Sequence, residues 1–199
     1  MKKNYRGLFV TLEGADKTGK STYVEKLAER LQDLPVVTTF EPGGTPIGQL
    51  LRRLLFEYKG LSKATELLLF NADRAQHYKE VIRPALKDGK IILCDRYFDS
   101  TLVYQGTLNK WNTGVLYRLH GISTGCLLPD VTYVCHGSVG NLGEDRYDNF
   151  DQELVQAQFV HLTTQGKRYR VIRNENSQKD NLDRMEREIR TAFKYRQGV

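Results

Sequence analysis

Short apolar runs alternate along this chain with longer stretches in which apolar residues recur at helical spacing. The runs predict strands at residues 7–12, 36–40, 90–94, 131–135 and 169–172. The longer stretches predict helices at residues 19–31, 46–57, 64–86, 108–126, 150–166 and 181–195. Strands that alternate with helices are typical of an α/β fold with helices on both faces of a parallel sheet. We therefore predict a three-layer α/β fold with about five parallel strands.

Nothing in this pattern divides the chain into parts. The sequence has no internal repeat, no low-complexity stretch and no Pro/Ser-rich linker, so we expect residues 1–199 to form one domain. The Gly-rich segment 137–149 follows neither period and is predicted to be a loop. Ligands of such folds bind beyond the carboxyl ends of the strands, and functional residues are expected there.

Composition and charge narrow the class of protein. Lys and Arg outnumber Asp and Glu by 30 to 24, a formal net charge of +6, which suits a nucleic acid or a small polyanion such as a nucleotide. The basic residues are scattered rather than clustered, which disfavours a nucleic-acid-binding protein. No apolar run approaches the roughly 20 residues of a membrane span. The three cysteines lack metal-binding spacing, and we expect reduced thiols in a cytoplasmic protein.

The strongest chemical signal is the segment GADKTGKS at residues 14–21. It matches the phosphate-binding pattern G-x-x-x-x-G-K-[ST], and it lies between a predicted strand and a predicted helix, as that motif requires. The glycines let backbone N–H groups approach phosphate oxygens, and the helix N-terminus adds partial positive charge. The motif therefore predicts a P-loop fold that binds ATP or GTP. Its predicted phosphate-binding residues are Gly14, Ala15, Asp16, Lys17, Thr18, Gly19, Lys20, Ser21 and Thr22.

A second signal follows the third predicted strand. Asp95 stands at the tip of an apolar run, where P-loop proteins place the carboxylate that orders the shell of Mg²⁺. Ser21 is the expected hydroxyl partner of the same ion. Arg96, the next residue, is a charge-assisted donor for phosphate oxygens. The sequence thus predicts Mg²⁺ as cofactor, with Ser21 and Asp95 as its site, partly through water.

Four further segments resemble the thymidylate kinase family. They are EPGGTPIG at residues 41–48, LFNADR at 69–74, VIRPALKDG at 81–89 and CDRYFDSTLVYQG at 94–106. The resemblance covers nearly the whole chain and weakens at residues 108–121 and after 165. The chain is similar to a divergent bacterial-like member, or to one carried by a phage or virus. The family's activity implies transfer of the γ-phosphate of ATP to dTMP.

The resemblance implies a dTMP site. Phe70 would stack on thymine, and Arg74, one helical turn further on, would donate to the base O4. Thr101 and Gln105 would complete the reading of the pyrimidine edge. The remaining implied contacts are Asp16 with the 3′-hydroxyl, Tyr104 where a ribose 2′-hydroxyl would lie, Arg52 and Arg96 with the phosphate, and Glu41 in the same site.

The resemblance also implies a catalytic set, consisting of Lys20, Arg96, Asp95, Lys17 and Asp16. Arg146, at the end of the 137–149 lid, would sit against ATP. Residues 137–144 of the lid contain no Arg or Lys, so Lys17 is expected to supply the extra positive charge near the transferred phosphoryl group. Phe40 stands where bacterial relatives usually have an arginine. The four histidines lack ligand spacing and are expected to be structural.

Other functions stay open at this point. A broad deoxynucleoside-monophosphate kinase or a deoxynucleoside kinase would share the fold, although Arg52 and Arg96 favour an acceptor that carries a phosphate. A nucleotide-binding module without catalysis would explain the absence of arginines from residues 137–144 of the lid. The family also implies a homodimer with small-molecule nucleotide partners, located in the cytoplasm of a bacterium or, for a phage or viral member, of its host.

Overall fold

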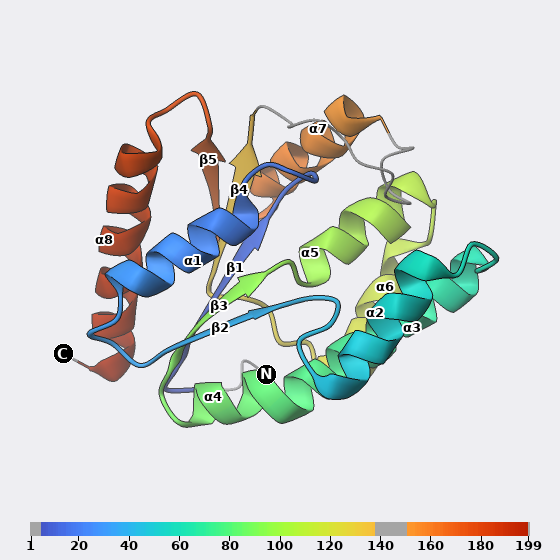
Figure 1. The fold of residues 1–199 in the computed structure, drawn as a ribbon, viewed down its shortest axis with the longest axis horizontal. Helices are drawn as coiled ribbons and strands as arrows, with labels where there is room; N and C mark the ends of the chain where they lie inside the picture. Colours follow the sequence, from blue (N-terminus) through green and yellow to red (C-terminus); the bar gives the residue numbers. More distant parts are fainter. Residues whose placement is uncertain (1–4, 138–150, 199) are drawn as a thin grey trace.

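A computed structural model describes residues 5–137 and 151–198, and a parallel sheet forms its centre (Figure 1). Within these residues the sheet has five strands, β1 (Leu8–Glu13), β2 (Val36–Phe40), β3 (Ile91–Asp95), β4 (Val131–His136) and β5 (Tyr169–Arg173). Their order is β2-β3-β1-β4-β5, and every neighbouring pair is parallel. The predicted α/β class and the five-stranded parallel sheet are confirmed.

The connections between the strands are mostly helical. The α-helices are α1 (Lys20–Arg30), α2 (Pro46–Glu57), α3 (Lys63–His77), α4 (Arg83–Lys87), α5 (Phe98–Thr101), α6 (Thr113–Thr124), α7 (Gln152–Leu162) and α8 (Gln178–Gln197). Two π-helical turns, η1 (Tyr78–Ile82) and η2 (Leu102–Leu108), and a 3₁₀ turn, η3 (Thr163–Gln165), extend some of them. None of the described helices is both long and apolar enough to cross a membrane.

Two of the predicted helices differ in detail from the structure. The stretch predicted as one helix at residues 64–86 consists of α3, η1 and α4 in succession. The wide turn η1 precedes Pro84, which has no N–H to donate and whose ring clashes with the carbonyl four residues earlier. The helix predicted at residues 108–126 begins only at Thr113, where Asn112 caps it by accepting from Gly114 N and Val115 N.

The alternating side chains of β1 serve both layers of the molecule. Leu8, Val10 and Leu12 pack with α1 and α8, whose buried residues include Leu27 and Ile189. On the other face, Phe9 packs in a second cluster, which draws on β3 and on the helical segments from α3 to α6: Leu67, Tyr78, Ile82, Ala85, Leu86, Ile92, Cys94, Tyr97, Phe98, Leu102 and Leu116. Both faces of the central strand are therefore covered, as a parallel sheet requires.

The register of the strands fixes where the functional loops meet. Leu12 of β1 is opposite Asp95 of β3, which is also opposite Phe40 of β2. The three strands therefore end at one edge of the sheet, and the loop after β1, the loop after β2 and helix α5 all start there (Figure 1). The strand order reverses beside β1, which is the position where open α/β sheets bind ligands.

Candidate active site

The loop between β1 and α1 has the backbone that the phosphate-binding motif predicts. Gly14 has a φ of 140°, and a Cβ there would lie 2.4 Å from the carbonyl oxygen of Cys135, so only glycine fits. Thr18 Oγ1 closes the loop by donating to Ala15 O at 2.9 Å. Gly19 is left-handed with a φ of 84° and precedes the first turn of α1. The free N–H groups of that turn are suited to an anion.

Two lysines belong to this loop. Lys20 is buried, and its Nζ donates to Ala15 O at 2.6 Å. Burial, reinforced by the neighbouring Arg96, lowers the pKa of Lys20 to about 8. Lys17 has a left-handed φ of 59° and lines the open hollow beside α1 together with Lys20, Ser21 and Thr22. Both cations thus border the space in which the motif predicts phosphates.

The predicted magnesium residues meet across the sheet edge. Ser21 Oγ donates to Asp95 Oδ2 at 2.5 Å. The other carboxylate oxygen, Asp95 Oδ1, is buried and has no hydrogen-bond partner among the described residues. A hydroxyl, a carboxylate and an unused buried oxygen form the oxygen-rich set that a hard divalent cation prefers. The residues present therefore fit Mg²⁺.

Arg96 connects the two loops. Its backbone is left-handed with a φ of 68°, and its N–H donates to Leu12 O at 2.9 Å. The guanidinium forms an ion pair with Asp16 at 2.5 Å and also donates to Gly14 O at 3.0 Å. Burial opposes ionisation of Asp16, but Arg96 and Lys20 outweigh it and lower the pKa of that carboxyl. Within the described residues the other left-handed non-glycine positions, besides Lys17, are Lys110 and Cys126.

A buried carboxyl behind Arg96 was not among the predicted site residues. Glu13, at the end of β1, accepts from Tyr97 N at 2.8 Å and from Ser100 Oγ at 2.6 Å. Ser100 Oγ in turn accepts from Arg96 Nη1 at 3.0 Å. Burial, reinforced by Asp99, raises the pKa of Glu13 to about 7. Glu13 therefore positions Arg96 through Ser100.

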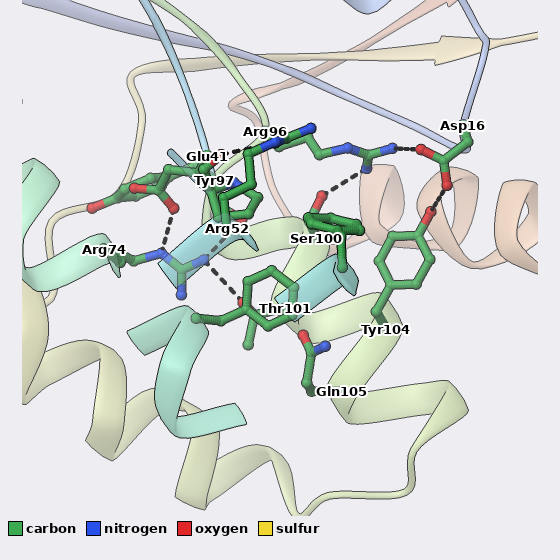
Figure 2. A pocket seen from close by; sticks show the side chains of 13 residues that line it. Asp16, Glu41, Arg52, Arg74, Arg96, Tyr97, Ser100, Thr101, Tyr104 and Gln105 are labelled. Atoms are coloured by element: carbon green, nitrogen blue, oxygen red, sulfur yellow. Dashed lines mark hydrogen bonds and ion pairs between the residues drawn. The ribbon is translucent and has the colours of Figure 1, made fainter. Parts of the chain in front are cut away.

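A second pocket lies beyond Arg96, between the loop after β2, helix α3 and the segment α5–η2 (Figure 2). It is more enclosed than the open hollow beside α1 and is called the closed pocket below. All nine residues predicted for the acceptor line it, and four others complete it: Asp16, Glu41, Pro42, Arg52, Phe56, Phe70, Arg74, Arg96, Tyr97, Ser100, Thr101, Tyr104 and Gln105. The helical spacing predicted for Phe70 with Arg74 and for Thr101 with Gln105 brings each pair to the pocket wall. The structure thus gathers residues that are up to 89 positions apart in sequence, from Asp16 to Gln105.

Arg74 is a more buried cation of the pocket than Arg96. It is only 2% exposed, its Nε donates to Glu41 Oε2 at 2.9 Å, and its Nη2 donates to Thr101 Oγ1 at 3.0 Å (Figure 2). Its Nη1 is buried and has no hydrogen-bond partner among the described residues. Burial opposes ionisation of Glu41, but Arg74 and His77 together outweigh it and lower the pKa of that carboxyl. One donor of a rigidly held guanidinium is thus left for a ligand.

Glu41 has a second partner, His77 of α3. His77 is fully buried, and its Nδ1 lies 2.9 Å from Glu41 Oε1. Its Nε2 lies 2.6 Å from Thr39 Oγ1. Both oxygens of Glu41 are therefore engaged by Arg74 and His77, and Glu41 acts on the pocket by fixing Arg74. His77 supports this network from behind the pocket.

The two hollows of the site are continuous through shared residues. Asp16, Glu41, Arg52 and Arg96 line both the closed pocket and the open hollow beside α1. Arg52 Nη1 donates to Pro42 O at 2.8 Å, and its guanidinium carbon lies 4.9 Å from the ring centre of Phe56 and 5.8 Å from that of Phe40. Phe40, where an arginine was expected in relatives, thus packs against Arg52.

One predicted site residue cannot be placed, and several residues of the site were not predicted from the sequence. Arg146 and nearly all of the predicted lid lie outside the described residues. Glu13 and His77 were missed because they touch other site residues rather than the space for a ligand. Ser100 lines the closed pocket and was missed although it lies within the segment CDRYFDSTLVYQG. A sequence signal existed for Glu13, since a carboxyl that ends an apolar strand directly before the P-loop must be buried.

The comparisons with known proteins agree with this geometry. A family model described as thymidylate kinase matches residues 12–185. A thymidylate kinase of Halothermothrix orenii is 36% identical, with 88% of this chain and 92% of the relative aligned. A thymidylate kinase of Thermomicrobium roseum is 48% identical, but the alignment covers 62% of this chain and 60% of that relative.

The solved structures give the same result. The crystal structure of thymidylate kinase from Ehrlichia chaffeensis matches with a TM-score of 0.78 and 30% sequence identity. The match covers 94% of this chain and 98% of that one. Sequence and three-dimensional similarity therefore extend over the P-loop, the closed pocket and the sheet that joins them.

Proposed function

The chain belongs to the thymidylate kinase family, and we propose that it transfers the γ-phosphate of ATP to dTMP to give dTDP and ADP. The observation that carries this proposal is the continuity of the site. A P-loop lies at one end and a closed pocket with a base-sized aromatic wall at the other, and they share Asp16, Arg52 and Arg96. Two anionic phosphates would meet at these shared residues.

The acceptor would enter the closed pocket with its base first. Phe70 offers a ring for stacking on a flat pyrimidine, and Arg74 Nη1 offers an unused donor for the base O4. Tyr104 OH donates to Asp16 Oδ2 at 3.3 Å, which holds the phenol beside the carboxylate expected to accept from the 3′-hydroxyl. There it would occupy the space of a ribose 2′-hydroxyl. Burial raises the pKa of Tyr104 to about 12, so Tyr104 stays a neutral donor. These contacts favour deoxyribonucleotides.

Positioning and charge neutralisation would carry the chemistry, because phosphoryl transfer needs little covalent help from the protein. Lys20 would exchange its bond to Ala15 O for phosphate oxygens, and Arg96 would bridge the two nucleotides. Lys17, at the mouth of the loop, would stabilise the transferred group. Bound at Ser21 and Asp95, Mg²⁺ would supply further charge neutralisation. Asp16 would accept from the 3′-hydroxyl and hold Arg96 in place.

A coupled ADP-release assay tests this function. The acceptors are dTMP, dUMP, dCMP, dGMP, UMP and thymidine, with ATP as donor and Mg²⁺ present. Activity should be confined to dTMP, with weaker use of dUMP. A preference for thymidine would contradict the arginine clamp on the acceptor phosphate. No turnover with any acceptor would contradict catalysis itself and favour a nucleotide-binding module.

We further propose that the protein is one domain that works as a homodimer in the cytoplasm. Helix α3 packs against both α2 and α6, and this group of helices exposes large apolar side chains: Ile47, Leu50, Leu54, Leu68 and Ile122. Large exposed apolar side chains on helices that pack against one another are what a subunit interface buries. Sedimentation equilibrium should give twice the chain mass, and Leu50→Glu should shift it to one chain mass. A monomeric unmodified protein would contradict the proposal.

A further inference from the structure

Gln105, at the wall of the closed pocket, is held by a residue that does not line the pocket. Its Nε2 donates to Glu66 Oε1 at 2.9 Å. Gln105 is 2% exposed and Glu66 is 3% exposed. Glu66 belongs to the first turn of α3, and Gln105 belongs to η2. The two side chains therefore join the two helical walls of the pocket through a buried hydrogen bond.

The chemistry of this pair fixes the direction of the amide. A carboxylate only accepts hydrogen bonds, whereas an amide has an NH₂ end that donates and an oxygen end that accepts. Gln105 must therefore turn its NH₂ group toward Glu66. Its Oε1 accepts no hydrogen bond from the described residues, and in Figure 2 it points to the side of Thr101. Gln105 thus presents an acceptor to the pocket.

The acceptor complements the donor of Arg74. Arg74 Nη1 is buried without a partner in the described part of the chain, and Arg74 Nη2 is bonded to Thr101. Arg74 and Gln105 line the same pocket. A donor and an acceptor offered by the pocket wall match a base edge with an oxygen next to an N–H group, which is the O4 and N3–H edge of thymine and uracil. Cytosine presents the opposite pattern, an amino group next to an unprotonated N3.

We propose that Glu66 is a positioning residue that determines base specificity, because it locks the Gln105 amide in the orientation that accepts 4-oxo pyrimidines and rejects 4-amino pyrimidines. This inference rests on the proposed function, since it assumes that the closed pocket takes a nucleoside monophosphate. A fixed acceptor at Gln105 favours thymine and uracil and disfavours cytosine. A buried acceptor left facing cytosine N3 would have no donor, and unsatisfied buried polar groups discriminate strongly.

The variant Glu66→Gln tests the lock. The amide introduced at position 66 can also donate, so Gln105 can turn over and present its NH₂ group to the pocket. We expect kcat/KM for dTMP to fall about tenfold, while kcat/KM for dCMP stays equal or rises. The dTMP/dCMP ratio should therefore fall at least about tenfold. Arg74 keeps the absolute rate with dCMP low, because it still faces the amino group.

A double variant should restore the lock. In Glu66→Gln/Gln105→Glu, the amide at position 66 donates to the carboxylate at position 105, whose second oxygen then faces the pocket as a fixed acceptor. The dTMP/dCMP ratio should return to within about threefold of the original. Glu80→Gln is the matched control, since Glu80 accepts from Gln76 at the protein surface, and it should leave the ratio unchanged.

The ratio of two acceptors measured on one preparation does not depend on how much of the variant is folded. An equal loss with dTMP and dCMP in Glu66→Gln would overturn the inference, because it would reduce Glu66 to a structural contact between α3 and η2. A ratio that stays low in the double variant would overturn it as well. Failure of the proposed function is distinct, since the unmodified protein would then not phosphorylate dTMP.

Discussion

The two ends of the site hold their cations in different ways. In the closed pocket Arg74 is fixed by Glu41 and Thr101 and keeps one buried donor unused. At the P-loop, Lys20 donates to its own loop carbonyl of Ala15 and Arg96 pairs with Asp16. A ligand base would therefore find its donor already in place, whereas a phosphate must replace contacts within the protein.

This difference suits two kinds of recognition. A neutral base is distinguished by the direction of a few hydrogen bonds, which calls for rigid partners that cannot adapt. A phosphoryl group that moves from donor to acceptor changes its charge distribution, and cations whose contacts can be exchanged can follow it. Substitutions at the P-loop should therefore lower the rate with every acceptor, and substitutions in the pocket should act on acceptor binding.

The largest expected effect is that of Lys20→Ala. Loss of the cation that is expected to contact the transferred phosphate should lower kcat about 10³-fold, with the order of preference among acceptors unchanged. The measurement is steady-state kinetics with dTMP and dUMP. Lys26→Ala is the control, because Lys26 lies on the same helix and its side chain bonds Gln178 away from the site. A changed order of preference among acceptors in Lys20→Ala would contradict the view that the P-loop sets the rate and the closed pocket selects the acceptor.

Lys17→Ala should have the next largest effect, about a 10²-fold fall in kcat with little change in KM for dTMP. The reason is that residues 137–144 supply no cation, so Lys17 is expected to provide the positive charge near the transferred phosphoryl group. Lys110→Ala is a matched control, since Lys110 has the same left-handed backbone outside the site. A kcat close to that of the unmodified protein would contradict the role of Lys17.

Arg74→Gln should act on acceptor binding alone. Without the buried donor, KM for dTMP should rise about thirtyfold, while KM for ATP and kcat change little. Arg83→Gln, at an exposed arginine of the following helix, controls for loss of a charge. Equal changes in the two KM values would show that the closed pocket and the P-loop do not act separately.

The smallest expected effect is a pH dependence of nucleotide affinity. Because burial lowers the pKa of Lys20 to about 8, the free protein loses this charge above pH 8, and phosphate binding must then restore the proton. The affinity for ADP should fall about twofold from pH 7 to 8 and about tenfold from pH 7 to 9. Isothermal titration calorimetry measures the affinity for ADP at each pH. In Lys20→Arg this affinity should no longer depend on pH in this range. The expected contacts of the base in the closed pocket do not involve Lys20, so dTMP affinity should change much less over this range.

The P-loop could be predicted from eight consecutive residues, whereas the closed pocket could not be predicted from local pattern. Phe70 by itself is an apolar residue on a helix, and only the family resemblance marked it as a site residue. Glu13 and Glu66 were missed for a physical reason. Each acts through one other side chain, and a local pattern does not show which distant residue a buried carboxyl will meet.

The strand ends show the same limit on a smaller scale. The predicted strands stop at the last apolar residue, but the ladders run one residue further, to Glu13 in β1 and Asp95 in β3. Main-chain pairing continues regardless of side-chain polarity once neighbouring strands are in register. The single helix predicted at residues 64–86 is likewise divided in the structure, because Pro84 widens the turn before it.

The left-handed backbone at Lys17 and Arg96 limits which positions can be substituted to make the protein more heat-resistant. Left-handed positions are the first targets of such work, since glycine or asparagine there relieves about 1 kcal/mol of strain. Lys110 and Cys126 share this backbone away from the site and are free to be exchanged. At Lys17 and Arg96 the same exchange would relieve backbone strain but remove the side chains that are expected to contact the phosphates. A screen that selects only for heat resistance would therefore enrich inactive protein at these two positions.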